Sequence, residues 1–211
     1  MSEIIQGSPE WHAIRVGKVT ASRVADVVAK TKSGWGASRA NYLAELIAER
    51  LTGDPAPSFT NAAMQWGTET EPLARAAYEF RADCEVTQIG FIHHPEIAMA
   101  GASPDGLIGT DGMIEIKCPN TATHIDTLLG QKVPEKYVTQ MQFQMACADR
   151  SWCDFVSFDP RLPEEMRVFV HRVTRDQDAI DYLEKEVMSF IYELDAKVDN
   201  LRRLYGQKAA A

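Results

Sequence analysis

Two carboxylates and a lysine stand close together near the middle of this chain of 211 residues. Asp105 lies in a Ser-Pro-Asp-Gly turn, and Glu115 and Lys117 follow in the stretch Met-Ile-Glu-Ile-Lys-Cys-Pro. Residues 112–118 alternate as a β-strand does, so Glu115 and Lys117 are expected on one face. Carboxylate oxygens and a backbone carbonyl suit Mg²⁺, and a lysine can orient or deprotonate the attacking water. This spacing is typical of a metal-dependent phosphodiesterase nuclease.

The same residues also fit a purely structural interpretation. Glu and Lys two positions apart on a strand often form a solvent-exposed face, and Asp-Gly is a common hairpin turn. The turn aspartate, the apolar flanks and the Cys-Pro end of the strand favour catalysis without deciding the question.

Two further polar residues are candidates for such a site. Glu71 is expected at the start of a helix over about residues 70–81, where it could add a metal ligand or simply complement the helix dipole. Gln140 falls on the polar side of a helix predicted over residues 134–149. There it could hydrogen-bond the attacking water or face solvent.

A candidate phosphate pocket lies near the N-terminus. Residues 11–22 contain Arg15, a helix start and the hydroxyl of Ser22. Arginine makes charge-assisted hydrogen bonds to phosphate, and a helix start offers backbone N–H groups to an anion. A terminal phosphate would fit these groups. A surface arginine beside an ordinary helix cap fits them equally well.

These residues are carried by alternating helical and strand patterns. Helices are predicted from Pro9 and over residues 21–29, 38–51, 70–81, 134–149 and 177–204, and strands over 86–93, 98–102, 112–118, 152–158 and 166–173. The last helix, about 177–204, is long and amphipathic. We therefore expect one α/β (α+β) domain over residues 1–211, with a central mixed β-sheet flanked by helices.

The composition restricts the class of protein. A net charge of −8 argues against a protein that coats DNA non-specifically, but an acidic exterior around a locally basic channel fits an enzyme. No apolar run approaches the ~20 residues of a membrane span, and the N-terminus lacks the pattern of a signal peptide. The four cysteines show no paired spacing. A cytoplasmic location without a membrane is expected.

Several separate motifs, in the same order, resemble the phage lambda exonuclease family, also called the YqaJ-type viral recombinases, of the PD-(D/E)xK nuclease superfamily. The matching segments are Glu10-Trp11-His12 through Arg15, Gly17, Thr20 to Ser22, Trp66 to Glu71, Ala102 to Leu107, Glu115 to Pro119, Tyr137 to Gln142, and Asp159 to Arg161. Together they are more specific than any one of them. The resemblance implies a core like that of restriction endonucleases.

The resemblance also implies a role for each matching residue of the reaction centre. The implied metal ligands are Glu71, Asp105, Glu115 and the backbone carbonyl of Ile116. The implied catalytic residues are Asp105, Glu115, Lys117, which would activate the water, and Gln140, which would help to place it. Two Mg²⁺ ions per site are implied, for which Mn²⁺ is an acceptable substitute.

Contacts to the DNA end follow from the same resemblance. Arg15, Ser22 and Ser103 would bind the 5′-phosphate of the strand being degraded, with Lys32 as a further basic contact. Met64 would separate the terminal base pairs.

One position departs from the family pattern. The family has an arginine about where Thr123 stands here, and the adjacent His124 is a candidate to replace it. The segment between Pro119 and Tyr137 also looks shorter.

The implied activity is that of a Mg²⁺-dependent 5′→3′ exonuclease. It would act on linear double-stranded DNA with 5′-phosphate ends, release 5′-mononucleotides and leave a 3′ single strand for recombination by strand annealing. The implied partners are further copies of the chain in a homotrimer and a phage-type single-strand annealing protein. Three alternatives stay open: an endonuclease on the same core, an inactive module that binds DNA ends, and a hydrolase of small phosphorylated metabolites.

Overall fold

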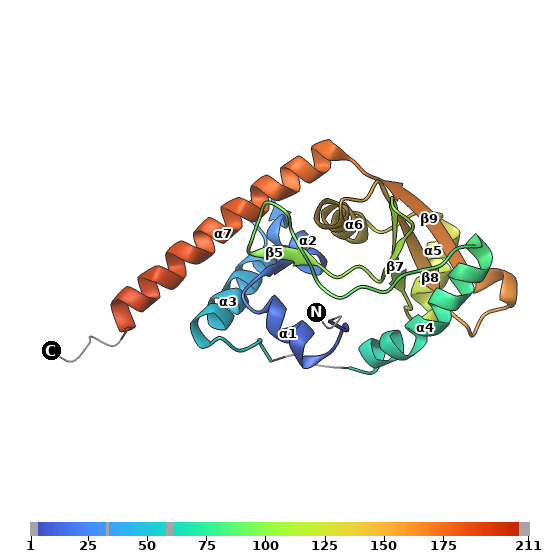
Figure 1. Ribbon diagram of the computed structural model, residues 1–211, viewed down its shortest axis with the longest axis horizontal. Coiled ribbons are helices and arrows are strands. Elements are labelled where there is room, and N and C mark those ends of the chain that lie inside the picture. The colour runs from blue at the N-terminus through green and yellow to red at the C-terminus, as the bar shows by residue number, and fades with distance from the viewer. Residues whose placement is uncertain (1–3, 33, 58–60, 207–211) are drawn as a thin grey trace.

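The structure is a computed structural model that describes residues 4–32, 34–57 and 61–206. Figure 1 shows two groups of elements. One contains the main sheet with its covering helices, and the other contains the N-terminal helices and the long C-terminal helix. Helix α6 lies between the two groups and belongs to the core of both.

The main sheet has four strands in the order β6-β7-β8-β9. These strands are β6 (Gly106–Ile108), β7 (Gly112–Lys117), β8 (Trp152–Phe158) and β9 (Val168–Thr174). The pair β7–β8 is parallel, and the outer pairs β6–β7 and β8–β9 are antiparallel. The predicted mixed sheet is therefore confirmed, with three of its strands close to their expected positions.

Helices cover both faces of this sheet. Helix α4 (Ala62–Ala82) lies on one face, and α5 (Thr121–Gly130) and α6 (Glu135–Ala148) lie on the other. Ile114 packs in the apolar cluster beneath α4, whereas its neighbour Met113 packs in the cluster beneath α6. Successive residues of β7 thus enter opposite halves of the core, as their alternation in the sequence predicts.

The second group of elements surrounds a small sheet in the order β1-β5-β4. The sheet strands are β1 (Val19–Thr20), β4 (Ile92–His93) and β5 (Ala100–Ala102), and a separate hairpin consists of β2 (Lys30–Thr31) and β3 (Gly34–Trp35). The helical segments are α1 (Pro9–Arg15), η1 (Ala21–Arg23), α2 (Val24–Val27), α3 (Ala37–Thr52) and α7 (Gln177–Tyr205), and η2 (Glu164–Met166) lies in the β8–β9 connection. Strand β5 pairs in parallel with β1, which joins the N-terminal segment to the chain just before Asp105.

Helix α7 lies along α2, α3 and α6 and then projects beyond the rest of the molecule (Figure 1). Its apolar stripe is buried as the sequence predicts, through Ile180, Leu183, Val187, Phe190, Ile191, Leu194 and Val198. None of the described helices is long and apolar enough to cross a membrane.

Helix α4 begins earlier than the predicted range of 70–81. Asn61 caps it, because the Asn61 side chain accepts a hydrogen bond from the backbone N–H of Met64 at 2.9 Å. Glu71 and Pro72 therefore lie inside the helix and not in its first turn. The proline misled the prediction, since proline is most common at the first helical position.

Two other local predictions were wrong, and one helix was missed. Residues 86–93 do not form one strand: Thr87 makes a single bridge to Leu107, and only the two residues of β4 follow. The helix expected over 21–29 is a 3₁₀ turn followed by the short α2. Helix α5 was not predicted, although Asn120 caps it by accepting the backbone N–H of Thr123.

Candidate active site

The hairpin of β6 and β7 holds the candidate catalytic groups. Asp105 directly precedes β6, and its Oδ2 accepts the backbone N–H of Ile116 in β7 at 2.6 Å. Glu115 and Lys117 lie on one face of β7, and the Nζ of Lys117 donates to Oε1 of Glu115. The sequence thus brings Asp105, Glu115 and Lys117 to one place, as expected from their spacing.

Glu115 is buried, with 1% of its surface exposed. The face that carries it lies against α6, so the pair with Lys117 does not form the solvent-exposed face that the structural interpretation requires. A buried carboxylate is costly unless it has hydrogen-bond donors and an opposite charge. Lys117 supplies the charge, and α6 supplies further donors.

Two glutamines of α6 donate to Glu115. The Nε2 of Gln140 donates to Oε1 of Glu115 at 2.7 Å, and the Nε2 of Gln144 donates to Oε2 at 2.7 Å. Gln140 is buried, so the option that it faces solvent is wrong. Sequence reasoning missed Gln144. The spacing of four between the two glutamines was the available signal, because residues at this spacing share a helix face.

The charges of the site perturb one another. Burial raises the pKa of Asp105 well above its ordinary value, and the charges of Glu115 and Glu71 raise it further. Burial alone would lower the pKa of Lys117, but Glu115 and Asp105 outweigh this effect and raise it. In this arrangement Lys117 is therefore a cation at neutral pH, and the pocket holds more carboxylate than one lysine neutralises.

The oxygen donors fit a hard divalent cation by their chemistry. Asp105, Glu115, Glu71 and the carbonyl of Ile116 are ligands of the type that Mg²⁺ prefers. Among the described residues, however, no three His, Cys, Asp or Glu side chains already form a cluster that could hold a metal ion. Both oxygens of Glu115 accept hydrogen bonds, Oε1 from Lys117 and Gln140 and Oε2 from Gln144. Oε1 of Glu71 accepts from Arg75 at 2.5 Å. Burial, and then the charges of Glu115 and Glu71, raise the pKa of Asp105, and a bound cation would favour its charged form.

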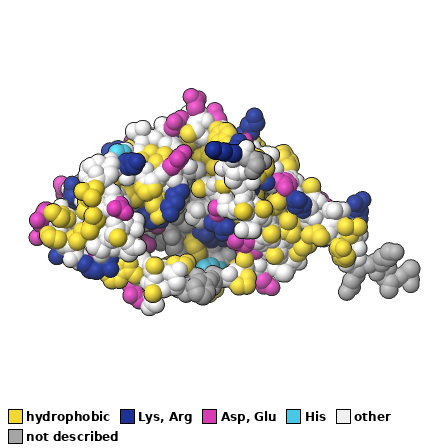
Figure 2. Space-filling model, turned by 180° about the vertical axis from the view of Figure 1, so that it is seen from behind, with side chains coloured by type: hydrophobic (Ala, Val, Ile, Leu, Met, Phe, Trp, Pro, Cys, Tyr) yellow, Lys and Arg dark blue, Asp and Glu magenta, His cyan; other side chains and the backbone are white. Residues whose placement is uncertain are grey.

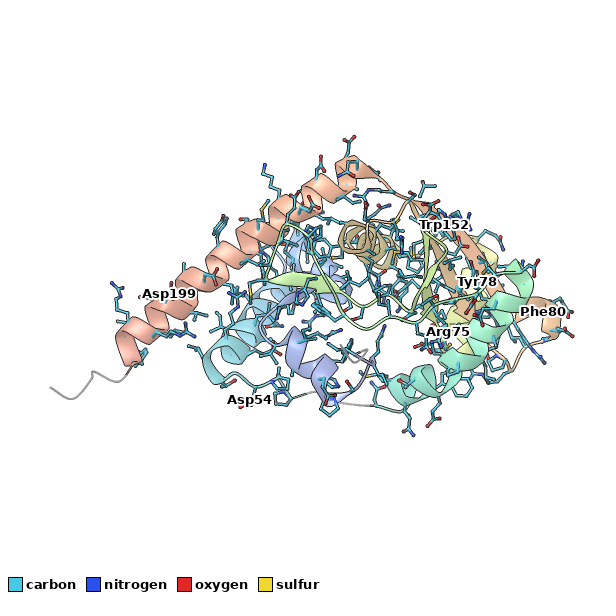
Figure 3. The ribbon with its side chains drawn as sticks, in the orientation of Figure 1. Asp54, Arg75, Tyr78, Phe80, Trp152 and Asp199 are labelled. Atoms are coloured by element: carbon cyan, nitrogen blue, oxygen red, sulfur yellow. The ribbon has the colours of Figure 1, made fainter. Side chains whose placement is uncertain are left out.

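Helix α4 is fixed to the sheet on the side away from this cluster. Figure 3 shows Arg75 and Tyr78 pointing from α4 toward the sheet, whereas Phe80 points outward. The hydroxyl of Tyr78 donates to Oδ2 of Asp154 in β8 at 2.7 Å. This contact holds α4 in a fixed position, and with it Glu71 one turn earlier than Arg75.

A cleft of 1340 Å³ connects the catalytic hairpin with the N-terminal elements. Its lining includes Asp105 and four other residues singled out in the sequence, namely Arg15, Ser22, Met64 and Glu71. Figure 2 shows a hollow of this kind near the middle of one face, with Lys and Arg side chains at the hollow. The molecule is acidic overall, but the lining of the cleft also includes Lys18, Arg23 and Arg75, so cations share the cavity with the carboxylates.

The candidate phosphate pocket is built around Ser103. The Nη1 of Arg15 lies 3.5 Å from Oγ of Ser103, and Nε1 of Trp11 donates to the same oxygen at 2.9 Å. The guanidinium of Arg15 lies 3.8 Å from the ring centroid of Trp11, a cation–π contact. Ser22 lines the same cleft and lies 3.3 Å, oxygen to oxygen, from Thr20. Trp11, for which sequence reasoning predicted no role, thus orients both Arg15 and Ser103.

A tight turn directly follows the helix that ends with Arg15. Gly17 follows α1 with a φ of +68°, a conformation that residues with a Cβ rarely adopt. Its backbone N–H donates to Oε2 of the buried Glu49 at 2.7 Å, and its carbonyl accepts from Nε of Arg50 at 2.8 Å. A side chain at Gly17 would meet Arg50 at 2.7 Å. Glycine is therefore required where the chain leaves α1 and enters β1.

The other residues considered as DNA contacts lie in different parts of the structure. Met64 is 53% exposed in the first turn of α4 and lines the cleft. Lys32 is exposed in the turn between β2 and β3, outside the cleft lining found for the described residues. His124 is fully buried, with Nδ1 at 2.7 Å from Oγ of Ser157 and Nε2 at 2.8 Å from the carbonyl of Met166. His124 therefore has a structural role and cannot replace the family arginine at a DNA contact.

The Asp-Pro-Arg motif links β8 to α4. Asp159 is fully buried and accepts Nε, Nη2 and the backbone N–H of Arg161 at 2.7, 2.9 and 3.0 Å. The guanidinium of Arg161 lies 4.4 Å from the ring centroid of Trp66. Burial opposes ionisation of Asp159, but hydrogen bonds from Arg161 and Thr121 outweigh it and lower the pKa of Asp159 to about 2.

Comparisons with known proteins identify the family and the fold. The family model described as the YqaJ-like viral recombinase domain matches residues 10–151. LHK-Exo, an alkaline exonuclease from Laribacter hongkongensis, is 55% identical in a crystal structure that covers 93% of this chain and 97% of its own, with a TM-score of 0.87. Its complex with dAMP has the same identity and coverage and a TM-score of 0.88.

A phage-related exonuclease from Haemophilus somnus 129PT shares the fold. It is 18% identical, the match covers 87% of this chain and 96% of that one, and the TM-score is 0.72. At this identity only the architecture is comparable. It is consistent with the predicted PD-(D/E)xK core. No curated protein matches the sequence.

Proposed function

This chain belongs to the YqaJ-like viral recombinase domain family, and we propose that it is a Mg²⁺-dependent 5′→3′ exonuclease of linear double-stranded DNA. The observation that carries the proposal is the cleft, in which Asp105 and Glu71 line the same cavity as Arg15 and Ser22. Carboxylates suited to a divalent cation thus lie within one cavity with groups suited to a terminal phosphate.

Asp105, Glu115, Glu71 and the carbonyl of Ile116 would hold the metal. Mg²⁺, or Mn²⁺ in its place, would stabilise charge on the phosphoryl group and lower the pKa of the attacking water, and two ions would serve both the attacking and the leaving oxygen. Lys117 would orient that water. Lys117 is a cation because Glu115 and Asp105 raise its pKa. Neutralising those carboxylates would therefore lower the pKa of Lys117 toward the range in which a lysine can accept a proton.

The cluster around Ser103 would set the polarity of digestion. Arg15 and Ser103, with Ser22 at the cleft wall, would hold the 5′-phosphate by charge-assisted hydrogen bonds. Met64, exposed at the start of α4, would separate the terminal base pairs. Only a free 5′ end places its scissile bond at the carboxylates, so 5′-mononucleotides would be released and a 3′ single strand would remain. The dAMP complex of LHK-Exo supports a mononucleotide product.

The assembly and its partner are part of the same proposal. The resemblance that implies the activity also implies a homotrimer that surrounds DNA and a phage-type single-strand annealing protein that takes up the 3′ strand. Enclosure of the DNA would allow a chain with a net charge of −8 to stay on its substrate. The site of action would be the cytoplasm.

The test is digestion of one plasmid in three forms with Mg²⁺. The forms are closed circular, linear with 5′-phosphate ends and linear with 5′-hydroxyl ends, and the proteins are wild type, Lys117→Ala and Lys185→Ala. Lys185, exposed on α7, is the matched control. The proposal expects loss of the linear phosphorylated form with wild type and Lys185→Ala, and none with Lys117→Ala.

Other outcomes would assign the chain differently. Cutting of the closed circle would identify an endonuclease. Binding to DNA ends without cutting would identify an inactive end-binding module. Hydrolysis of small phosphate esters, but of no DNA form, would identify a metabolite hydrolase.

A further inference from the structure

The carboxylate of Glu115 has hydrogen-bond donors on both of its oxygens. Oε1 accepts from Gln140 and Lys117, and Oε2 accepts from Gln144. A carboxylate offers about two acceptor sites per oxygen, so Oε1 is fully used and Oε2 has one site left. Donors on both oxygens also fix the rotation of the carboxylate about its last bond. Without Gln144, only Oε1 would be held.

Gln144 is an unusual choice for its surroundings. It is 1% exposed and lies on α6 between the buried Phe143 and Met145. Its amide nitrogen faces Glu115, which leaves its Oε1 buried with no hydrogen-bond partner among the described residues. A buried polar atom without a partner destabilises a protein, and an apolar side chain of similar length would avoid it. Gln144 therefore leaves one polar atom unpaired in order to make a single contact, the hydrogen bond to Glu115.

The adjacent Gln142 provides a contrast on the same helix. It is also buried, but its Nε2 donates to the carbonyl of Thr174 at 2.8 Å and its Oε1 accepts the backbone N–H of Asp176 at 2.9 Å. Both polar atoms of the amide are thus satisfied, and they fasten α6 to the junction between β9 and α7. Gln142 holds the fold together, whereas Gln144 has its one contact at the candidate catalytic carboxylate.

We infer that Gln144 is a positioning residue that sets the orientation of Glu115 for metal binding. This inference rests on the proposed function, since it assumes that Glu115 is a metal ligand. Gln144 holds Oε2 in place and leaves one acceptor site on that oxygen unused. Its partner Gln140 holds the other oxygen. The two amides together keep the carboxylate plane fixed.

The experiment compares Gln144→Met with the matched control Gln142→Met. Methionine has nearly the same length and volume as glutamine, but it cannot make the hydrogen bonds of the amide. For each variant and the wild type, thermal unfolding is measured without metal and over a series of Mg²⁺ concentrations, and cleavage of linear DNA is measured over the same series. The concentration for half-maximal stabilisation reports metal binding independently of activity.

Groups that orient a metal ligand typically change affinity by about 10–100-fold. Gln144→Met is expected to raise the Mg²⁺ concentration for half-maximal stabilisation, and that for cleavage, by about this factor. Gln142→Met is expected to lower the unfolding temperature without moving either concentration. Gln144→Asn, whose shorter side chain cannot reach Glu115, is expected to repeat the effect and serves if the methionine variant does not fold.

Two results would overturn the inference while leaving the proposed function intact. One is a Gln144→Met enzyme with wild-type Mg²⁺ dependence, and the other is an equal shift in both methionine variants. Absence of any Mg²⁺ effect on the stability of the wild type would instead overturn the proposed function, and the role of Gln144 with it.

Discussion

Replacement of Asp159 by Asn tests the electrostatics of the Asp-Pro-Arg motif. Asp159 is fully buried and accepts three N–H groups of Arg161, which in turn stacks on Trp66 of α4. Its pKa falls from the ordinary 3.8 to about 2 because the hydrogen bonds from Arg161 and Thr121 outweigh the effect of burial. Folding therefore favours the ionised carboxylate of Asp159, and an asparagine side chain cannot carry that charge.

The magnitude follows from the pKa. A fall from 3.8 to about 2 corresponds to roughly 2 kcal/mol of stability at neutral pH, because each tenfold change in the ionisation constant corresponds to about 1.4 kcal/mol. The side chain of Arg161 is 45% exposed, so solvent screening reduces this figure. We expect Asp159→Asn to lower the free energy of unfolding by about 1–2 kcal/mol at pH 7.

The pH dependence has a definite sign. Because the pKa is lower in the folded protein, the stabilisation is present above the unfolded value near 3.8 and is lost as the pH falls toward 2. Urea unfolding at pH 7, 5 and 3 measures it, with Asp126→Asn on the exposed face of α5 as the control. The difference between wild type and Asp159→Asn should shrink at pH 3. A difference that is absent at pH 7, or constant with pH, would refute the reasoning.

Three further predictions concern other contacts. Trp11→Phe keeps an aromatic ring but removes the N–H that donates to Ser103. In steady-state kinetics, KM for 5′-phosphorylated ends should therefore rise about 5-fold with kcat unchanged. An equal rise in KM for 5′-hydroxyl ends would contradict this prediction. Met64→Ala should slow digestion of paired ends more than of mismatched ends, and equal slowing in a comparison of the two substrates would exclude strand separation by this residue. Tyr78→Phe leaves the buried Asp154 without one donor and should cost about 1–3 kcal/mol in urea unfolding. A change in Mg²⁺ dependence would show that Tyr78 acts on the site as well.

Where a segment follows one periodicity, that of a helix or that of a strand, its secondary structure can be predicted well from the sequence. Strand β7 was predicted because its alternation corresponds to two different apolar surroundings, beneath α4 and beneath α6. Helix α7 was predicted because one stripe of a long helix is buried and the rest is solvated. The candidate residues came together because one short hairpin holds them: Asp105 directly precedes β6, and Glu115 and Lys117 lie in β7.

The errors arise where contacts between distant parts of the chain, and not the local sequence pattern, determine the structure. Gln140 and Gln144 were difficult to place because α6 is buried on nearly all sides, and a polar residue on a buried face looks like one on a solvated face until its partner is known. Residues 86–93 have strand-like composition but pair only at Thr87 and in β4. Lys32 was assigned by resemblance alone, and it lies in a surface turn where local pattern says nothing about its distance from the cleft.

The parallel pairing of β7 and β8 has a consequence for how the site opens. The glutamines lie in the crossover that joins these strands, so Gln140 is only 25 residues and Gln144 only 29 residues from Glu115 along the chain. The contact between Arg15 and Ser103 instead closes a loop of 88 residues. Closing the longer loop costs about 1 kcal/mol more in chain entropy. Partial unfolding therefore separates the phosphate-binding groups while the carboxylate and its amides stay together, and amide hydrogens near Arg15 should exchange with solvent sooner than those of β7.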